Sequence, residues 1–156
     1  MQTFKQFFME RKYWGREAAG TIFVAADTGR ILFLRRSGEE DSEQGQWEIT
    51  IGGRKDDDDL NIAVTRDREA GEELGVAITV LDTKTIEIFD DVGDDHEPFR
   101  YTVFLKTVPD EFTPKLSDEH DAWRWAYPNI GKECPTPLHF GAERLIANPR
   151  MKDRFA

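Results

Sequence analysis

The order of apolar and polar positions predicts strands in the first third and the middle of the chain, and helices near the centre and the end. Two runs rich in β-branched and aromatic residues, 18–25 and 31–34, flank the polar sequence Asp27-Thr28-Gly29-Arg30. This pattern is typical of a β-hairpin. A third run, 47–51, precedes Gly52-Gly53 and is also expected to be a strand.

Residues 60–74 are expected to form a helix, because good helix formers predominate and Gly75 stands where a C-terminal cap is expected. Their apolar residues make no continuous stripe, which indicates a helix with a polar role. The pattern also predicts strands at 76–81, 85–89 and 101–108, and a closing helix at 138–151. Because strands and helices do not alternate at βαβ spacing, the fold class is predicted to be α+β, a sandwiched arrangement rather than a doubly wound sheet.

The size and composition favour one domain spanning residues 1–156, since 38% of the 156 residues are hydrophobic. Residues 1–16 are expected to form an arm or short helix that packs on the core, with a homodimer contact as the alternative. No apolar run approaches the roughly 20 residues of a membrane span, and no secretory signal is recognised, so the cytoplasm is the expected compartment. The single cysteine, Cys134, is expected to be an inert thiol.

The net charge of -10 narrows the choice of partners. An extended nucleic acid is not expected, because its phosphates are neutralised by many Lys and Arg side chains. A phosphorylated small molecule is compatible with the charge if a divalent cation lies between the protein carboxylates and the phosphate oxygens.

The segment richest in candidate chemistry is Arg68-Glu69-Ala70-Gly71-Glu72-Glu73-Leu74-Gly75-Val76. Positions i, i+3 and i+4 of a helix are neighbours, so its three glutamates are expected within one turn. Three carboxylates repel one another unless a cation neutralises them, and hard oxygen ligands suit Mg²⁺ or Mn²⁺. The alternative is a solvated acidic face, which is common on glutamate-rich helices.

This segment resembles the second half of the Nudix box, G-x5-E-x7-R-E-U-x-E-E-x-G-U, in which U is a bulky aliphatic residue. The strand from Trp47 into Gly52-Gly53, and the strand pair that ends in Leu34-Arg35-Arg36-Ser37, are also similar to that family. The resemblance covers about residues 18–130 and implies the Nudix fold, a mixed β-sheet sandwiched between helices. The box positions match at Arg68, Glu69, Glu72, Glu73, Gly75 and Val76.

The first half of the box departs from the family pattern. Leu60 occupies the position of the first glutamate, Arg54 occupies that of the glycine, and Gly53 lies one residue early. A one-residue loop insertion explains the glycine, and Asp59 would then replace the glutamate that orients the arginine. The metal-binding half is therefore predicted to be intact and the loop half remodelled, with reduced or specialised activity.

The resemblance implies a role for each matching residue. Glu69, Glu72 and Glu73 are expected to hold one or more Mg²⁺ ions, or Mn²⁺, with the Gly53 carbonyl as a further ligand, and Glu72 and Glu73 thereby act in catalysis. Such ions bridge the diphosphate oxygens and lower the pKa of the attacking water. Arg68 is expected to pair with Asp59 or Glu72 and hold the loop against the helix. The candidates for phosphate binding are Arg35, Arg36, Arg54, Lys55 and Arg100.

A general base is expected in Ser117–Trp125, which is similar to a segment of many Nudix enzymes, including GDP-mannose hydrolases that place a histidine base there. Glu119 and His120 are the candidates, and solvated side chains are the alternative. The aromatic residues Phe89, Phe99 and Tyr101 are expected mainly in the core, with stacking on a base or sugar as the alternative.

The leading functional hypothesis is Mg²⁺-dependent hydrolysis of a diphosphate bond in a nucleoside diphosphate linked to another moiety. The alternatives are a nucleoside triphosphate or sugar-nucleotide hydrolase and a catalytically weakened nucleotide-binding module. An isomerase of the same fold is disfavoured, because it would need a cysteine in an early loop and Cys134 comes too late.

Overall fold

The computed structural model describes residues 16–38, 44–92, 97–129 and 132–151. Seven strands and two helices are assigned within these ranges. In chain order they are β1 (Arg16–Ala25), β2 (Ile31–Arg36), β3 (Trp47–Glu48), β4 (Ile51–Arg54), α2 (Ile62–Leu74), β5 (Asp82–Val92), β6 (Pro98–Val108), β7 (His120–Ala126) and α3 (Phe140–Ile146).

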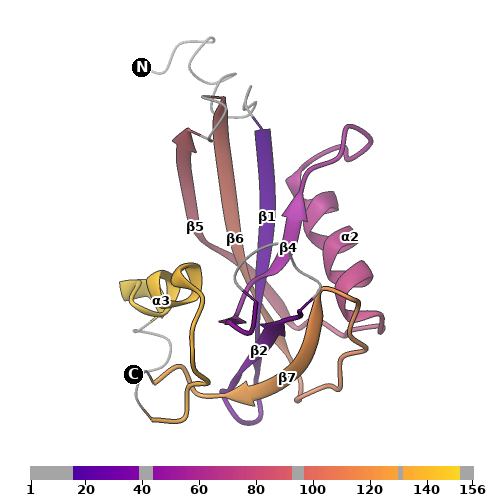
Figure 1. Cartoon of the computed structure of the whole chain (residues 1–156). Coiled ribbons are helices and arrows are strands. Elements are labelled where there is room, and N and C mark those ends of the chain that lie inside the picture. Colours follow the sequence, from indigo (N-terminus) through magenta and orange to yellow (C-terminus); the bar gives the residue numbers. More distant parts are fainter. Residues whose placement is uncertain (1–15, 39–43, 93–96, 130–131, 152–156) are drawn as a thin grey trace.

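The strands form one mixed sheet in the order β3-β2-β1-β6-β5, with β4 paired to β1 and β7 paired to β2. The only parallel pair among the described strands is β1 with β6, which runs from Arg16 opposite Phe99 to Ala25 opposite Val108. The antiparallel pair β1 and β2 is the predicted hairpin, with Val24 opposite Ile31. Figure 1 shows the long strands β1, β5 and β6 side by side.

Two apolar cores lie on opposite faces of this sheet, because successive side chains of a strand point to opposite faces. Ile22 and Phe33 pack into a core that includes residues of α3, whereas Phe23 and Leu34 pack into a core that includes residues of α2. The sheet therefore lies between α2 and α3 (Figure 1). The predicted α+β class and sandwiched sheet are confirmed.

The central helix begins and ends close to the predicted bounds. The Asn61 side chain caps its N-terminus by accepting a hydrogen bond from the Val64 N–H at 3.1 Å. Gly75 ends it in the left-handed region, with φ of 60°, and its N–H donates to the Gly71 carbonyl. These caps set the ends of α2, and burial of Ala70 and Leu74 against the sheet sets the directions of its glutamates.

Two strand predictions need correction. Residues 76–81 form no regular strand, because Val76 and Ile78 pack against the core that includes residues of α2. A segment that lies on the face of a sheet cannot also pair with a strand within that sheet. The predicted strand 47–51 is two short strands, because β3 pairs with β2 whereas β4 pairs with β1. Gly52 and Gly53 consequently lie within β4 rather than after it.

The closing helix is α3, which ends at Ile146 and is followed by a separate helical turn at 149–151. Apart from Arg16, the predicted N-terminal arm lies outside the described residues. Neither helix of the described chain combines the length and the apolar character needed to cross a membrane.

Candidate metal and catalytic site

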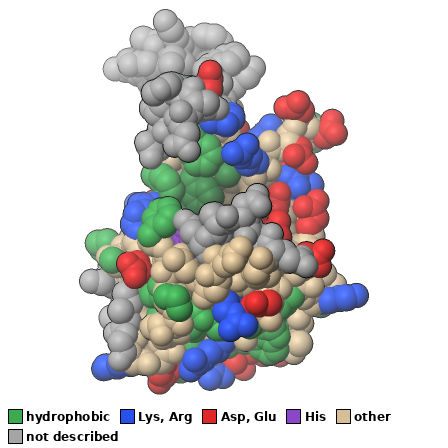
Figure 2. Space-filling model, in the orientation of Figure 1, with side chains coloured by type: hydrophobic (Ala, Val, Ile, Leu, Met, Phe, Trp, Pro, Cys, Tyr) green, Lys and Arg blue, Asp and Glu red, His purple; other side chains and the backbone are tan. Residues whose placement is uncertain are grey.

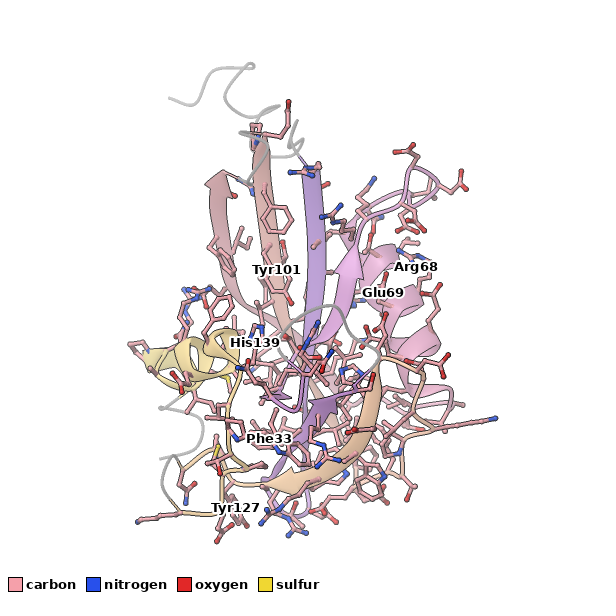
Figure 3. All side chains as sticks on the ribbon, in the orientation of Figure 1. Phe33, Arg68, Glu69, Tyr101, Tyr127 and His139 are labelled. Atoms are coloured by element: carbon pink, nitrogen blue, oxygen red, sulfur yellow. The ribbon has the colours of Figure 1, made fainter. Side chains whose placement is uncertain are left out.

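A polar cavity of about 550 Å³ lies where β4, α2 and the segment before β7 meet. Its walls combine carboxylates, arginines and exposed backbone, the groups expected of a site for a cation and a phosphate. The lining residues are Arg36, Glu48, Thr50, Gly52, Gly53, Arg54, Glu73, Tyr101 and Glu119. In Figure 3, Arg68 and Glu69 extend from α2, on the opposite side of the sheet from α3 and His139.

The end of the Glu69 side chain lies against the backbone of Gly53. A Cβ atom at position 53 would lie 2.7 Å from Cδ and from Oε1 of Glu69, so any larger residue there would displace this carboxylate. Glu69 is half-buried against this glycine, and burial raises the pKa of its carboxyl while neighbouring Arg68 opposes the rise. The Gly53 backbone and the Glu69 carboxylate therefore meet at the edge of the cavity.

Glu73 is the most deeply buried of the three box glutamates, with 5% of its surface exposed. Its Oε2 atom is buried and has no hydrogen-bond partner in the described part of the chain. Burial, reinforced by neighbouring Glu119, raises the pKa of Glu73 to about 10. A buried carboxylate oxygen without a donor is costly, and a divalent cation would satisfy it. The residues present therefore fit a metal ion.

Glu72 lies differently from the other two glutamates. Its side chain is 59% exposed and accepts hydrogen bonds from Arg68 Nη1 at 3.2 Å. At 3.6 residues per turn, consecutive residues are about 100° apart, so Glu72 and Glu73 cannot face the same wall. Of the three glutamates, Glu73 lines the cavity, Glu69 lies beside the cavity residue Gly53, and Glu72 is directed to solvent.

Arg68 connects the helix to the loop that precedes it. Its guanidinium donates to Glu69, to Glu72 and to the Arg54 carbonyl, the last at 3.0 Å. It also donates to buried Asp59 at 3.1 Å, and this bond contributes most to lowering the pKa of Asp59 to about 2. Asp59 thus stands where the one-residue insertion predicts it, and Leu60 is 90% exposed. Figure 2 shows acidic side chains gathered over this part of the surface.

His120 and Glu119 occupy contrasting environments at the start of β7. Glu119 is exposed, whereas only 5% of His120 is exposed, so the alternative of a solvated side chain is wrong for His120. The His120 Nε2 atom shares a hydrogen bond with Glu48, while Nδ1 is buried without a partner among the described residues. One ligand atom each of Glu73, Glu119 and His120 lie within 4.8 Å of one another.

The candidate phosphate-binding residues divide into two groups. Arg36 and Arg54 line the polar cavity. Arg35 pairs with Asp121 at 2.7 Å, and Arg100 pairs with Asp90 at 2.7 Å. Neither Arg35, Arg100 nor Lys55 is part of the cavity wall. The structure therefore brings two of these five cations to the carboxylates.

A second cavity, of about 670 Å³, adjoins the first and shares Arg36, Glu48, Thr50 and Tyr101 with it. Tyr101 fits at the junction because position 20 is glycine: a Cβ atom there would lie 2.0 Å from the tyrosine Oη. Glu48, Thr50 and the residues of α3 are not predictable as site residues from the sequence, because they meet the box only in the fold. The remaining lining residues are Phe89, Phe99, His139, Phe140, Gly141, Arg144 and Leu145.

The raised pKa of Glu73 predicts how stability depends on pH in the metal-free protein. Between the ordinary glutamate value of 4.5 and about 10, the folded chain retains a proton that the unfolded chain has lost. This contribution to stability is therefore largest at low pH and declines as the pH rises through that window. We expect the melting temperature in chelator to fall more steeply from pH 6 to pH 9 for the natural chain than for Glu73→Gln. Equal slopes would contradict the assignment.

Comparisons with known proteins agree with the fold described above. No curated protein matches the sequence. Among solved structures, the MutT NUDIX hydrolase from Burkholderia pseudomallei is 24% identical, with a TM-score of 0.66 over 86% of this chain and 97% of that one. The NUDIX domain of Shewanella oneidensis NrtR, complexed with ADP ribose, is 13% identical, with a TM-score of 0.66 over 96% and 98% of the two chains.

A Nudix hydrolase from M. smegmatis, RenU, is 17% identical, with a TM-score of 0.62 over 89% of this chain and 83% of that one. At these identities the solved structures establish the fold. The family model described as NUDIX domain matches residues 15–145. The predicted resemblance is thereby confirmed, and with it, at the level of the family, the assignment as a Nudix-type pyrophosphohydrolase. The chain belongs to the NUDIX domain family.

Proposed function

We propose that this protein hydrolyses a diphosphate bond in a nucleoside diphosphate derivative and requires Mg²⁺. The observation that carries the proposal is the buried Glu73 carboxylate, whose Oε2 atom has no described partner and which lies in a cavity with two arginines. Carboxylates and cations on the walls of one cavity suit a metal-bridged phosphate, because the ion joins the carboxylates to the phosphate oxygens.

Glu69 and Glu73 are the residues proposed to hold the ion, with Glu72 and the Gly53 carbonyl as further ligands at the rim. A bound Mg²⁺ would screen charge on the leaving phosphate and lower the pKa of the attacking water. Arg36 and Arg54 are proposed to bind the phosphate oxygens, since they line the same cavity. Through its bonds to Asp59 and to the Arg54 carbonyl, Arg68 positions the loop above the helix.

Glu119 is the proposed general base. It lies within 4.8 Å of the Glu73 carboxylate and is exposed, so water reaches it and a proton leaves it readily. His120 is less suited to that role, because it is buried and its Nε2 atom is already bonded to Glu48. Glu119 therefore accepts the proton of the attacking water in this proposal.

The aromatic cavity is proposed to bind the nucleoside part of the substrate. Its volume of about 670 Å³ falls within the usual range for small-molecule sites, and Phe89, Phe99 and Tyr101 offer flat apolar faces to a base. Because this cavity shares four lining residues with the polar one, a single molecule can extend from one to the other. The ADP ribose in the NrtR complex is a ligand with this combination of parts.

A nucleotide-binding module without turnover is the second candidate. It is favoured by the remodelled loop, in which the shorter Asp59 replaces the box glutamate and Leu60 points to solvent. The buried carboxylates favour the enzyme instead, since binding alone does not require Glu73 to be held at such an electrostatic cost.

A hydrolysis screen, read by chromatographic separation of the nucleotide products, distinguishes the two candidates. The panel contains nucleoside diphosphate sugars, ADP ribose, dinucleoside polyphosphates and nucleoside triphosphates, each with Mg²⁺ and with chelator. We expect Mg²⁺-dependent turnover of at least one nucleoside diphosphate derivative. Binding of ADP ribose without turnover of any compound would favour the module. A cytoplasmic location, a single domain over 1–156 and a homodimer remain predictions from the sequence.

A further inference from the structure

We propose that the metal site contains a nitrogen ligand: the His120 imidazole, together with Glu73 and Glu119, binds a divalent transition ion such as Mn²⁺ more tightly than Mg²⁺. The proposal rests on the proposed function, because it concerns the ion at the same site. It makes His120 a ligand rather than a candidate base, and it gives Glu119 the role of a ligand in place of the base role proposed above.

The first observation is the position of the three side chains. A ring nitrogen of His120 and one carboxylate oxygen each of Glu73 and Glu119 lie within 4.8 Å of one another. Glu73 and His120 are both buried, with 5% of each residue exposed, while Glu119 closes the group from the solvent side. One ion can therefore contact ligand atoms of all three residues.

The second observation is an unsatisfied ring nitrogen. Nε2 of His120 is hydrogen-bonded to Glu48, and the carboxylate of Glu48 also lies 3.5 Å from Arg36. When the ring donates from Nε2 to this carboxylate, the lone pair is on Nδ1, which is buried and has no described partner. Histidines that bind metals usually donate their other N–H to a carboxylate in this way, which fixes the ring and makes it a better ligand.

The ligand atoms of the three side chains determine which ion the site prefers. Mg²⁺ prefers oxygen ligands in near-ideal octahedral geometry, whereas imidazole nitrogen suits transition ions. Mn²⁺ accepts carboxylate oxygen as readily as Mg²⁺ does, so a mixed set of two carboxylates and one imidazole shifts the preference toward Mn²⁺. Glu69, half-buried beside Gly53, lies outside this group of three and offers oxygen only.

Pulsed electron paramagnetic resonance of the Mn²⁺-loaded full chain tests the proposal without depending on turnover. We expect the ¹⁴N modulation of a directly bound imidazole. When histidine alone is labelled with ¹⁵N, the ¹⁴N signal is replaced by that of ¹⁵N. The chain contains three histidines, so the signal must also disappear in His120→Gln, whose amide retains a donor for Glu48.

His139→Asn is the matched control, because asparagine retains an acceptor for the Gly141 N–H while another imidazole is removed. It is expected to leave the ¹⁴N signal unchanged, and His120→Gln is expected to reduce the preference for Mn²⁺ over Mg²⁺ by about tenfold. Bound Mn²⁺ without ¹⁴N modulation in the natural chain would overturn the proposal, even if the substrate were still hydrolysed. A clear ¹⁴N signal with no turnover would support the histidine ligand and would contradict only the proposed hydrolysis.

Discussion

Glu73→Gln is expected to lower Mg²⁺-dependent turnover by about 100-fold or more, because the substitution removes the charge but keeps the size of the buried side chain. The Glu73 carboxylate is nearly inaccessible to water, and no described group satisfies its Oε2 atom in the metal-free protein. The measurement is kcat at saturating substrate, together with the Mg²⁺ concentration that gives half-maximal activity.

The matched control is Glu143→Gln, an exposed glutamate in the first turn of α3. It removes the same charge away from the polar cavity and is expected to leave kcat within about twofold, since isolated surface charges contribute little. Similar losses in both variants would show that overall charge, rather than the ion, determines activity. Turnover that survives Glu73→Gln would remove Glu73 from the site.

Arg68→Ala is expected to have the second largest effect, a loss of about 100-fold in kcat, because a displacement of about 1 Å in a catalytic group has that consequence. The guanidinium is the shared donor for Asp59, Glu69, Glu72 and the Arg54 carbonyl. Without it the loop loses its attachment to α2. Arg68→Lys restores the charge but not the planar fork of donors, so we expect only partial recovery of kcat.

Arg66→Lys is the matched comparison on the same helix. Arg66 stacks on Phe104 and pairs with Asp67 on the side of α2 away from the polar cavity. We expect its kcat to stay within about threefold of the natural value, while its melting temperature changes as much as that of Arg68→Lys. If the two variants lose activity equally, the loss follows from stability, and the positioning role of Arg68 is wrong.

The parts of the fold that can be predicted depend on interactions between residues close together in the sequence. The C-terminal cap Gly75 and the charged pattern of 62–74 act within one helix, so they can be predicted without knowledge of the neighbouring elements. The β-branched residues of 76–81 favour a strand. The segment nevertheless lies on the face of the sheet, because β5 already occupies the edge beside β6. Propensity alone contains no information about that competition.

The site shows the same division. The box residues lie close in sequence, so the pairing of Arg68 with Asp59 followed from spacing and a single insertion. Glu48 was not singled out, because its contact with His120 joins positions 72 residues apart. The aromatic cavity likewise joins β5, β6 and α3, and only the fold shows that Phe140 and Arg144 face the same space as Phe99. Burial of His120 could not be predicted either, because its neighbours in the sequence are polar.

In the proposed function, α2 and β4 together bind a divalent ion. The most direct test is a crystal of the natural chain soaked in Mn²⁺ and measured at a wavelength where manganese scatters anomalously. We expect an anomalous peak in contact with the carboxylate of Glu73, adjacent to Gly53 and Glu69. Ordered carboxylates with no peak between them at millimolar Mn²⁺, or a peak bound only elsewhere on the acidic surface, would contradict it.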